Sequence, residues 1–268
     1  DMRLYKSRAE VAAMRRAARL SAQAHCELMR HCEPGMYEYQ LASLFSHHCQ
    51  MNGAAQLAYS SIVGGGNNAC VLHYVENSQV LSEGDLVLID AGCEVECYAS
   101  DITRTFPVGG RFSDAQRALY EVVLEAQLAA IAKVRAGNHW NDPHQAAARA
   151  LTKGLLKLGL LRGTLAKALK TRSYARFFMH RTGHWLGMDV HDVGDYKIDG
   201  HWRELEPGMV LTVEPGLYIP RGAKGIAKKW QGIGIRIEDD VLVTQGEPDV
   251  LTRDVPKTVE QIEALMAR

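Results

Sequence analysis

The spacing of apolar residues divides the chain into helical segments that are each followed by strands. Ser7 and Glu10 form a capping box, and the helical spacing after them predicts a long helix that ends before Glu33-Pro34-Gly35. A second helix is predicted at 37–51, where Asn52-Gly53 stops it. Further helices are predicted at 113–134, from Asp142-Pro143 onward with interruptions at glycines 154, 159 and 163, and at 256–267.

Short apolar runs predict the strands. They lie at 60–63, 86–91 and 97–106, and strand patterns dominate from 177 to 243. The runs at 86–91 and 97–106 flank Gly92, so we expect a hairpin with a tight turn there. Helix pairs precede strands in both halves of the chain. The pattern therefore predicts an α+β fold with a mostly antiparallel sheet and two similar halves.

Three of the apolar runs end in a carboxylate. LVLID at 86–90 delivers Asp90, MVLTVE at 209–214 delivers Glu214, and IGIRIE at 233–238 delivers Glu238. Acids are rarely buried unless they pair with a cation or bind a metal. Asp101 adds a fourth carboxylate, and four converging acids could not all ionise without counter-charge. Two divalent cations would supply that charge.

The predicted hairpin brings the first two acids together. It would place Asp90 and Asp101 on neighbouring strands, close enough to bind one ion or to bridge two. Asp101, Thr103 and Thr105 would share one face of the second strand. The two hydroxyl groups could then support the carboxylate.

The other two acids lie beside residues that can orient them. Pro215-Gly216 follows Glu214 and ends its strand, which fixes the direction of the carboxylate. Arg236, Glu238 and Asp240 alternate onto one face of the last strand, so Arg236 can pair with a metal-bound carboxylate. The alternative is an Arg236–Glu238 pair on an exposed edge strand.

A histidine-rich segment, HRTGHWLGMDVHD at 180–192, offers imidazole ligands. It contains His180, His184 and His191, and its Gly183 and Gly187 permit close approach of the backbone. A helical H-x-x-x-H would suggest a zinc protease, but the glutamate of that motif is missing and Gly183 disfavours a helix. We expect one histidine to be a ligand and the others to act as acid–base or oxyanion-stabilising groups.

Four carboxylates and one imidazole form a hard ligand set, suited to manganese, cobalt, iron or zinc. Two such ions lower the pKa of a bridging water and polarise a carbonyl group, so hydrolysis of an amide or ester is the natural use. The chain contains no G-x-S-x-G nucleophile motif.

Composition narrows the function further. The 268 residues include 31 basic and 31 acidic side chains, and this zero net charge argues against a nucleic-acid partner or an anionic-membrane partner. No apolar run approaches the roughly 20 residues of a membrane span, and the N-terminus lacks a secretory signal pattern. The six cysteines form no C-x-x-C pair, so we expect reduced thiols in a cytoplasmic protein. Because the chain starts with Asp rather than Met, a fragment of a longer protein is also expected.

Five ordered segments carry a family resemblance: LVLIDAG, SDITRTFPV, HRTGHWLGMDVHD, VLTVEPGLY and GIGIRIEDD. Together they resemble the metallopeptidase family that holds aminopeptidase P, prolidase and methionine aminopeptidase, over nearly the whole chain. Within it, CVLHYVEN, HWLGMDVHDVG and GIGIRIEDD look most like bacterial aminopeptidase P. The resemblance implies the pita-bread fold, with residues 1–268 as the catalytic domain. From the resemblance we also expect that residues 1–268 do not include the N-terminal domain that similar proline peptidases carry.

The resemblance also implies roles for individual residues. The ligands of two metal ions would be Asp90, Asp101, His184, Glu214 and Glu238, with Asp101 and Glu238 bridging both ions. Glu214 would also position the bridging hydroxide and take up its proton.

Further residues match positions around the substrate. His191 resembles the histidine that stabilises the tetrahedral intermediate, while His73 and His180 resemble histidines of the substrate pocket. Arg236 resembles the arginine that supports the ligands, and Tyr218, in VLTVEPGLY, is expected to contact substrate.

The implied activity is that of an Xaa-Pro aminopeptidase, which cleaves after the first residue of peptides with proline in second place. Two manganese ions are the expected cofactor, with cobalt or zinc as alternatives, and the full-length protein is expected to form a homo-oligomer. Prolidase, restricted to dipeptides, is the nearest alternative, and methionine aminopeptidase fits the motifs less well. A non-catalytic peptide-binding relative would usually have lost metal ligands, whereas all five positions are filled here.

Overall fold

The computed structural model describes residues 2–267, with helices and short antiparallel strands in the predicted order. The α-helices are α1 (Arg8–His31), α2 (Glu38–Met51), α3 (Asp114–Ile131), α4 (Asn141–Lys157), α5 (Leu165–Lys170) and α6 (Val259–Met266). Short 3-10 helices are η1 (Gly66–Cys70), η2 (Ser173–Arg176) and η3 (Lys228–Trp230).

The strands form several small sheets, all antiparallel. In the first half they are β1 (Gln56–Leu57), β2 (Ile62–Gly65), β3 (Leu86–Asp90), β4 (Cys93–Val95), β5 (Tyr98–Ala99) and β6 (Thr103–Pro107). In the second half they are β7 (Lys197–Ile198), β8 (His201–Trp202), β9 (Val210–Val213), β10 (Gly216–Ile219), β11 (Ile233–Arg236), β12 (Asp239–Leu242) and β13 (Asp249–Val250). The α+β prediction and the antiparallel pairing are confirmed.

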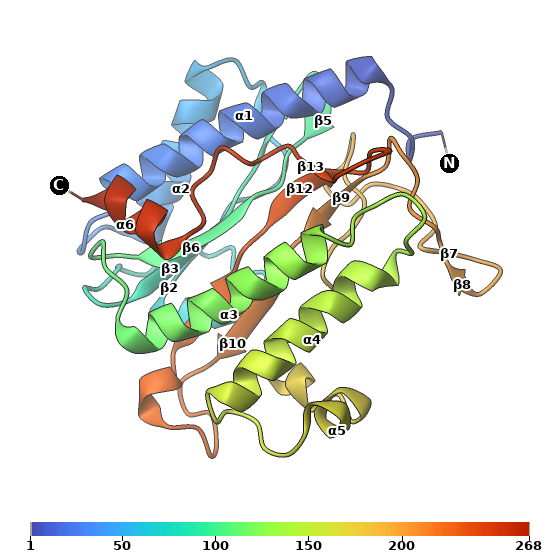
Figure 1. The fold of residues 1–268 in the computed structure, drawn as a ribbon. Helices are drawn as coiled ribbons and strands as arrows, with labels where there is room; N and C mark the ends of the chain where they lie inside the picture. Colours follow the sequence, from blue (N-terminus) through green and yellow to red (C-terminus); the bar gives the residue numbers. More distant parts are fainter. Residues whose placement is uncertain (1, 268) are drawn as a thin grey trace.

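The long helices cover one side of the strands, as Figure 1 shows for α1, α3 and α4. The helix α1 packs on α2, β4 and β5, while α3 packs on α4 and on β9, β10 and β11. The order of strands is β2-β3-β6 in one sheet and β13-β12-β9 in another, and β11 contacts both β3 and β6. The two halves of the chain therefore meet where the acidic strand ends lie.

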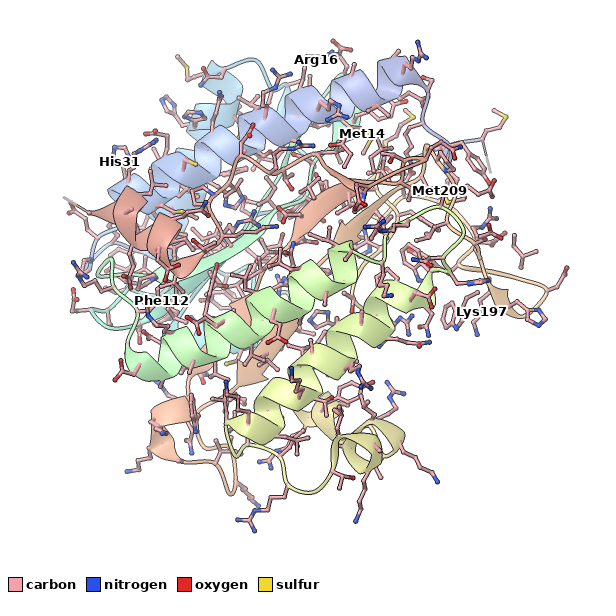
Figure 2. All side chains as sticks on the ribbon, in the orientation of Figure 1. Met14, Arg16, His31, Phe112, Lys197 and Met209 are labelled. Atoms are coloured by element: carbon pink, nitrogen blue, oxygen red, sulfur yellow. The ribbon has the colours of Figure 1, made fainter. Side chains whose placement is uncertain are left out.

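Side chains fill the space between helices and strands (Figure 2), and most of the buried ones are apolar. Met14, on the inner side of α1, is 1% exposed and packs with Leu186 and Val210, whereas the Arg16 side chain on the same helix is 43% exposed. This division follows the helical spacing of apolar residues in the sequence. No helix among residues 2–267 is long and apolar enough to cross a membrane.

The predicted tight turn at Gly92 is wrong. The strands β3 and β6 do pair, with Asp90 opposite Thr103, but residues between them form the separate β4–β5 hairpin, which pairs with β1. This hairpin turns at Glu96 and Cys97, both at positive φ. A Cβ atom at Gly92 would collide with the Ser100 carbonyl oxygen, so the glycine serves a close crossing of the chain.

The single strand predicted at 233–240 is also wrong. It breaks after Arg236, so that β11 pairs with β10 and β12 pairs with β9. The break lets the Ile237 amide donate to Pro215 and the Glu238 amide donate to Thr103, at 3.3 and 3.0 Å. Tertiary hydrogen bonds therefore interrupt a locally regular pattern.

Two smaller boundaries differ. The helix α4 begins at Asn141 with Trp140 as its N-cap, whereas Asp142 was the predicted N-cap, so the helix starts two residues earlier than predicted. It also continues through Gly154. A Cβ atom at this position would collide with Val122 of α3, so a glycine is needed where the two helices pack. Gly154 thus serves helix packing and does not interrupt the helix. The strand predicted at 60–63 lies at β2 and extends into the glycines.

Candidate metal centre

A cavity of about 370 Å³ opens where the two halves of the chain meet. Nine of the ten predicted site residues line it: Asp90, Asp101, His184, Glu214, Glu238, His73, His180, His191 and Arg236. Tyr218 is 1% exposed and lies behind His180, where its hydroxyl is 2.8 Å from His180 Nε2. Its role as a substrate contact stays a prediction, and these contacts suit a residue that positions His180.

Asp90 and Asp101 meet at the paired strands β3 and β6. Asp90 ends β3, and Asp101 lies two residues before β6. The hydroxyl of Tyr59 lies 2.6 Å from Asp90 Oδ1 and 2.5 Å from Asp101 Oδ1. Since a tyrosine hydroxyl has one proton, it can donate to only one of the two at a time.

The two glutamates come from the second half of the chain. Glu214 follows β9, and its amide donates to the Thr182 carbonyl oxygen at 2.9 Å. Glu238 lies between β11 and β12, and its Oε2 accepts a hydrogen bond from the Thr103 hydroxyl at 2.5 Å. The predicted support of Asp101 by Thr103 is therefore wrong, because the Thr103 hydroxyl donates to Glu238, in the segment between β11 and β12.

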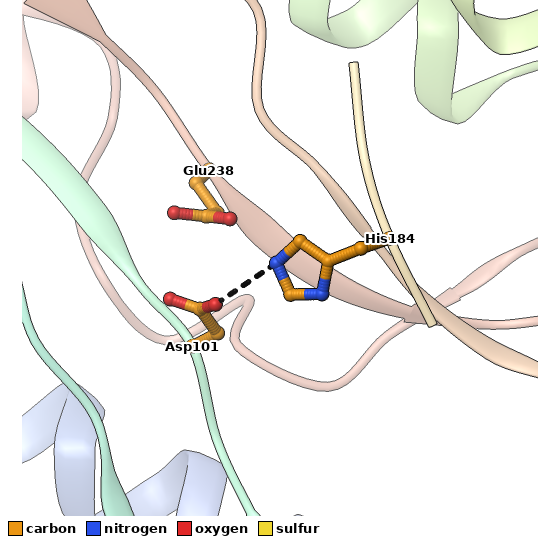
Figure 3. Close-up of side chains that lie close together, drawn as sticks. All are labelled: Asp101, His184 and Glu238. Atoms are coloured by element: carbon orange, nitrogen blue, oxygen red, sulfur yellow. Dashed lines mark ion pairs between the residues drawn. The ribbon is translucent and has the colours of Figure 1, made fainter. Parts of the chain in front are cut away.

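His184 faces these carboxylates (Figure 3). Its Nε2 lies 3.3 Å from Asp101 Oδ2 and 3.9 Å from Glu214 Oε1. Its Nδ1 is 3.0 Å from the Trp185 carbonyl oxygen, to which a protonated Nδ1 donates. In that tautomer Nε2 keeps its lone pair for a ligand.

Asp101, His184 and Glu238 form the tightest group. All three are buried, and one potential ligand atom from each lies within 4.8 Å of the others. Figure 3 shows their side chains directed toward a common space. A single ion could therefore contact all three with only small side-chain movements.

Arg236 is the buried cation of the site. It is 3% exposed, and its Nη2 donates to Asp90 Oδ2 at 2.7 Å. Its Nε and Nη1 reach the hydroxyls of Thr103 and Tyr218, both at 3.1 Å. The predicted pairing with an acid of the site is thus present, and the exposed edge-strand alternative is wrong.

The acids lack enough counter-charge. Burial, and then neighbouring acids, raise the pKa of Asp90 and hold the pKa of Glu238 well above its usual range. Burial raises the pKa of Glu214 to about 7, against the opposing effect of His184. One arginine therefore does not stabilise four ionised carboxylates.

Asp101 and His184 stabilise each other. Burial opposes ionisation of both, but their hydrogen bond outweighs it, lowering the pKa of Asp101 and raising the pKa of His184 to about 9.

The remaining histidines surround the cavity. The ring centroid of His191 lies 3.9 Å from that of His184, and His180 Nδ1 lies 3.9 Å from Glu214 Oε2. Burial lowers the pKa of His180 to about 3, so this side chain is neutral near pH 7. His73 is exposed at the cavity wall.

The segment that carries three of these histidines is irregular, which excludes the helical zinc-protease arrangement. As predicted, Gly183 permits a close approach, because a Cβ atom there would collide with the Thr212 carbonyl oxygen. The Thr212 hydroxyl also accepts from the His184 amide at 3.1 Å. This contact fixes the backbone of the histidine.

Sequence reasoning missed one residue at the site and did not foresee the contact of another. Tyr59 contacts two of the acids, but nothing in its local sequence distinguishes it from any tyrosine before a strand. Asp240 was expected only to share a face with Arg236 and Glu238. Its Oδ2 accepts a hydrogen bond from the Asp101 amide at 3.1 Å, so Asp240 holds the backbone of a proposed ligand.

The donor set fits hard divalent cations. Oxygen donors dominate, one imidazole is oriented by a backbone carbonyl, and Arg236 balances only part of the charge of the carboxylates. The three-residue group supplies a ligand cluster without any large rearrangement.

Comparison with known proteins agrees with this geometry. The model of metallopeptidase family M24 matches residues 12–245. The chain belongs to this family. The Xaa-Pro aminopeptidase of Escherichia coli (strain K12) is 48% identical over 266 residues, covering 99% of this chain and 60% of that protein. The Haemophilus influenzae Xaa-Pro aminopeptidase is 47% identical over 266 residues, covering 99% and 61%.

A solved M24 relative shares the fold closely. The structure of Pseudomonas aeruginosa aminopeptidase PepP matches with a TM-score of 0.99 at 56% identity, covering 100% of this chain and 60% of that one. The pita-bread fold predicted from the motifs is therefore confirmed. The chain spans about 60% of the length of these relatives.

Proposed function

We propose that this chain hydrolyses the peptide bond between an N-terminal residue and a following proline, using two divalent metal ions. The group formed by Asp101, His184 and Glu238 carries the proposal, because it offers three buried ligand atoms within 4.8 Å of one another. The names of the most similar relatives support the substrate class. We also propose that the protein is cytoplasmic, that it binds neither nucleic acid nor membrane, and that it forms a homo-oligomer when full length.

Five side chains would hold the ions. These are Asp90, Asp101, His184, Glu214 and Glu238, and manganese is the ion proposed, with cobalt or zinc as alternatives. Bound ions of this kind lower the pKa of a water molecule and polarise the substrate carbonyl.

The protein's own groups would complete the reaction. Glu214 is the proposed general base, because it lines the cavity and its Oε1 lies 3.9 Å from Nε2 of the proposed ligand His184. His191 is the proposed donor to the developing oxyanion. His180, neutral and held by Tyr218, and exposed His73 are proposed to contact the substrate. Arg236 is proposed to orient Asp90.

Metal analysis tests the core of this proposal. After incubation with manganese and removal of unbound ions, we expect about two equivalents per chain by plasma mass spectrometry. Less than one equivalent would favour the non-catalytic peptide-binding alternative.

Peptide assays test the specificity. Arg-Pro-Pro should lose its first residue, and Met-Ala-Ser should remain intact. A dipeptidase is the second candidate, because the rat Xaa-Pro dipeptidase is 39% identical over 300 residues, covering 100% of this chain and 61% of that protein. Cleavage of Xaa-Pro dipeptides alone would establish that alternative.

A further inference from the structure

A second cavity adjoins the candidate metal centre. It has a volume of about 790 Å³ and is lined by residues of α4, α5, η2 and β8, with further residues between α3 and α4. Arg181 lines both this cavity and the metal cavity, so the two spaces share a wall. We call the second cavity the basic cleft, after four of its lining residues: Lys133, Arg149, Arg172 and Arg181.

Positive charge in the basic cleft is not neutralised. Its acidic lining residue is Asp142, whose Oδ2 already accepts a hydrogen bond from the His139 amide at 2.8 Å. Within residues 2–267, the side chains of Lys133, Arg149 and Arg172 have no ion-pair or hydrogen-bond partner. A concave surface with charge of one sign concentrates ions of the opposite sign.

Arg181 is held in place at the shared wall. Its Nη2 donates to Asn141 Oδ1 at 2.7 Å, and its guanidinium carbon lies 4.8 Å from the centroid of the Trp202 ring. The Lys197 ammonium also lies over this ring, at 4.3 Å. A guanidinium fixed by an amide and an aromatic face loses less freedom when it binds a carboxylate.

We propose that the basic cleft binds carboxylate groups of the peptide substrate beyond the proline. This inference rests on the proposed function. An aminopeptidase holds the free N-terminus of its substrate in the catalytic cavity, so any part of the peptide that reaches a neighbouring cleft lies on the C-terminal side of the cleaved bond. The carboxylate can come from an Asp or Glu side chain or from the C-terminus of a short peptide.

Matched peptides test the cleft. We compare Ala-Pro-Ala-Ala-Glu and Ala-Pro-Ala-Ala-Gln, each as the C-terminal amide, in the manganese-loaded protein at low ionic strength. The glutamate peptide should have a kcat/KM about fivefold higher, and salt should reduce this preference. Adding the free-acid forms distinguishes the two sources, because a terminal carboxylate should raise kcat/KM of the glutamine peptide if the C-terminus is bound.

Two variants with equal charge change locate the effect. The double variant Arg149→Gln/Arg172→Gln should abolish the preference while kcat/KM for the glutamine amide stays unchanged. The control Lys157→Gln/Arg162→Gln also removes two exposed positive charges, at the end of α4 and in the connection to α5, outside the cleft lining, and should keep the preference. Circular dichroism confirms that each variant is folded.

The outcomes separate the cleft from the proposed function. Equal kcat/KM for the glutamate and glutamine amides in the unmodified chain, or a preference that persists in the double variant, overturns the cleft proposal. If the unmodified chain cleaves neither peptide, the proposed function fails. Isothermal titration calorimetry then tests the cleft proposal by peptide binding alone. Tighter binding of the glutamate peptide that is lost in the double variant supports the proposal, and equal binding of the two peptides overturns it.

Discussion

Glu238 and Asp239 are neighbours in the sequence and are both buried, yet they meet different surroundings. Asp239 faces two protein cations, with Arg104 Nη2 at 2.8 Å and Lys257 Nζ at 2.7 Å from its carboxylate. The Thr252 hydroxyl adds a hydrogen bond at 2.7 Å. Burial opposes ionisation of Asp239, but Arg104 and Lys257 outweigh it and lower its pKa to about 2. Asp239 is therefore ionised and stabilising in the protein alone.

Glu238 faces other acids. Its neighbours Asp101, Glu214 and Asp90 add to the effect of burial, and its pKa is held well above the usual range. The Thr103 hydroxyl is its hydrogen-bond donor. The comparison teaches that a buried acid whose counter-charge comes from the protein serves stability, whereas a group of acids without it is suited to bind cations.

The largest expected effect comes from removing a proposed ligand. Asp101→Asn should lower kcat on Arg-Pro-Pro by about 10³-fold, because it weakens the metal site and the fixed position of the catalytic water. Initial rates and metal content are measured together, and circular dichroism should be unchanged. Full metal content with near-normal turnover would contradict the ligand role.

Removing a cation that pairs with Asp239 should affect stability and not the metal site. Arg104→Met should lower the free energy of unfolding by about 3–5 kcal/mol, because it leaves buried Asp239 with only part of its counter-charge. Urea unfolding measures this. Arg16→Met, at an exposed pair with Glu96, is the matched control and should change the free energy by less than about 1 kcal/mol.

Manganese should stabilise the folded protein through the acids around Glu238 and not through the ion pairs of Asp239. At a manganese concentration of about 100 times Kd, the free energy of unfolding should rise by about 2.7 kcal/mol relative to protein in EDTA. Glu238→Gln should remove most of this gain, whereas Arg104→Met should retain it. An equal gain in Glu238→Gln would mean that the ion binds elsewhere.

Ionisation of Glu214 and of Asp239 should change the free energy of unfolding in opposite directions as pH rises. The pKa of Glu214 is raised to about 7 in the folded protein, so ionisation there should reduce the stability of EDTA-treated protein as pH rises from about 4.5 to 7. The effect should be on the order of 1–3 kcal/mol and disappear in Glu214→Gln. Asp239 behaves in the opposite way: its contribution is present above about pH 4 and is lost as pH falls through about 2. Urea unfolding measures the free energy of unfolding across this pH range. The same pH dependence in Glu214→Gln and in the unmodified protein would contradict the prediction.

Much of the candidate site could be predicted because its residues follow strong local patterns. Asp90, Glu214 and Glu238 each end or follow an apolar run, so at least partial burial could be expected before any contact was known. The long helices were also predictable, since capping residues and helical spacing are local signals.

Other features have no local signal. Tyr59 reaches Asp90 and Asp101 only because the chain before β2 folds beside the ends of β3 and β6. The Gly92 turn was mispredicted because a long-range pairing with β1 stabilises the β4–β5 hairpin. Gly154 looked like a helix interruption because its packing partner, Val122, lies on another helix.

The sequence by itself indicated that Asp101 and Glu238 would lie inside the molecule and that histidines and carboxylates would share a site. Only the tertiary structure decided that Arg104 and Lys257 neutralise Asp239 while Glu238 faces three acids. The reason is physical: the local pattern of a strand separates its two faces, but the charge that a buried residue meets on each face comes from segments distant in the sequence.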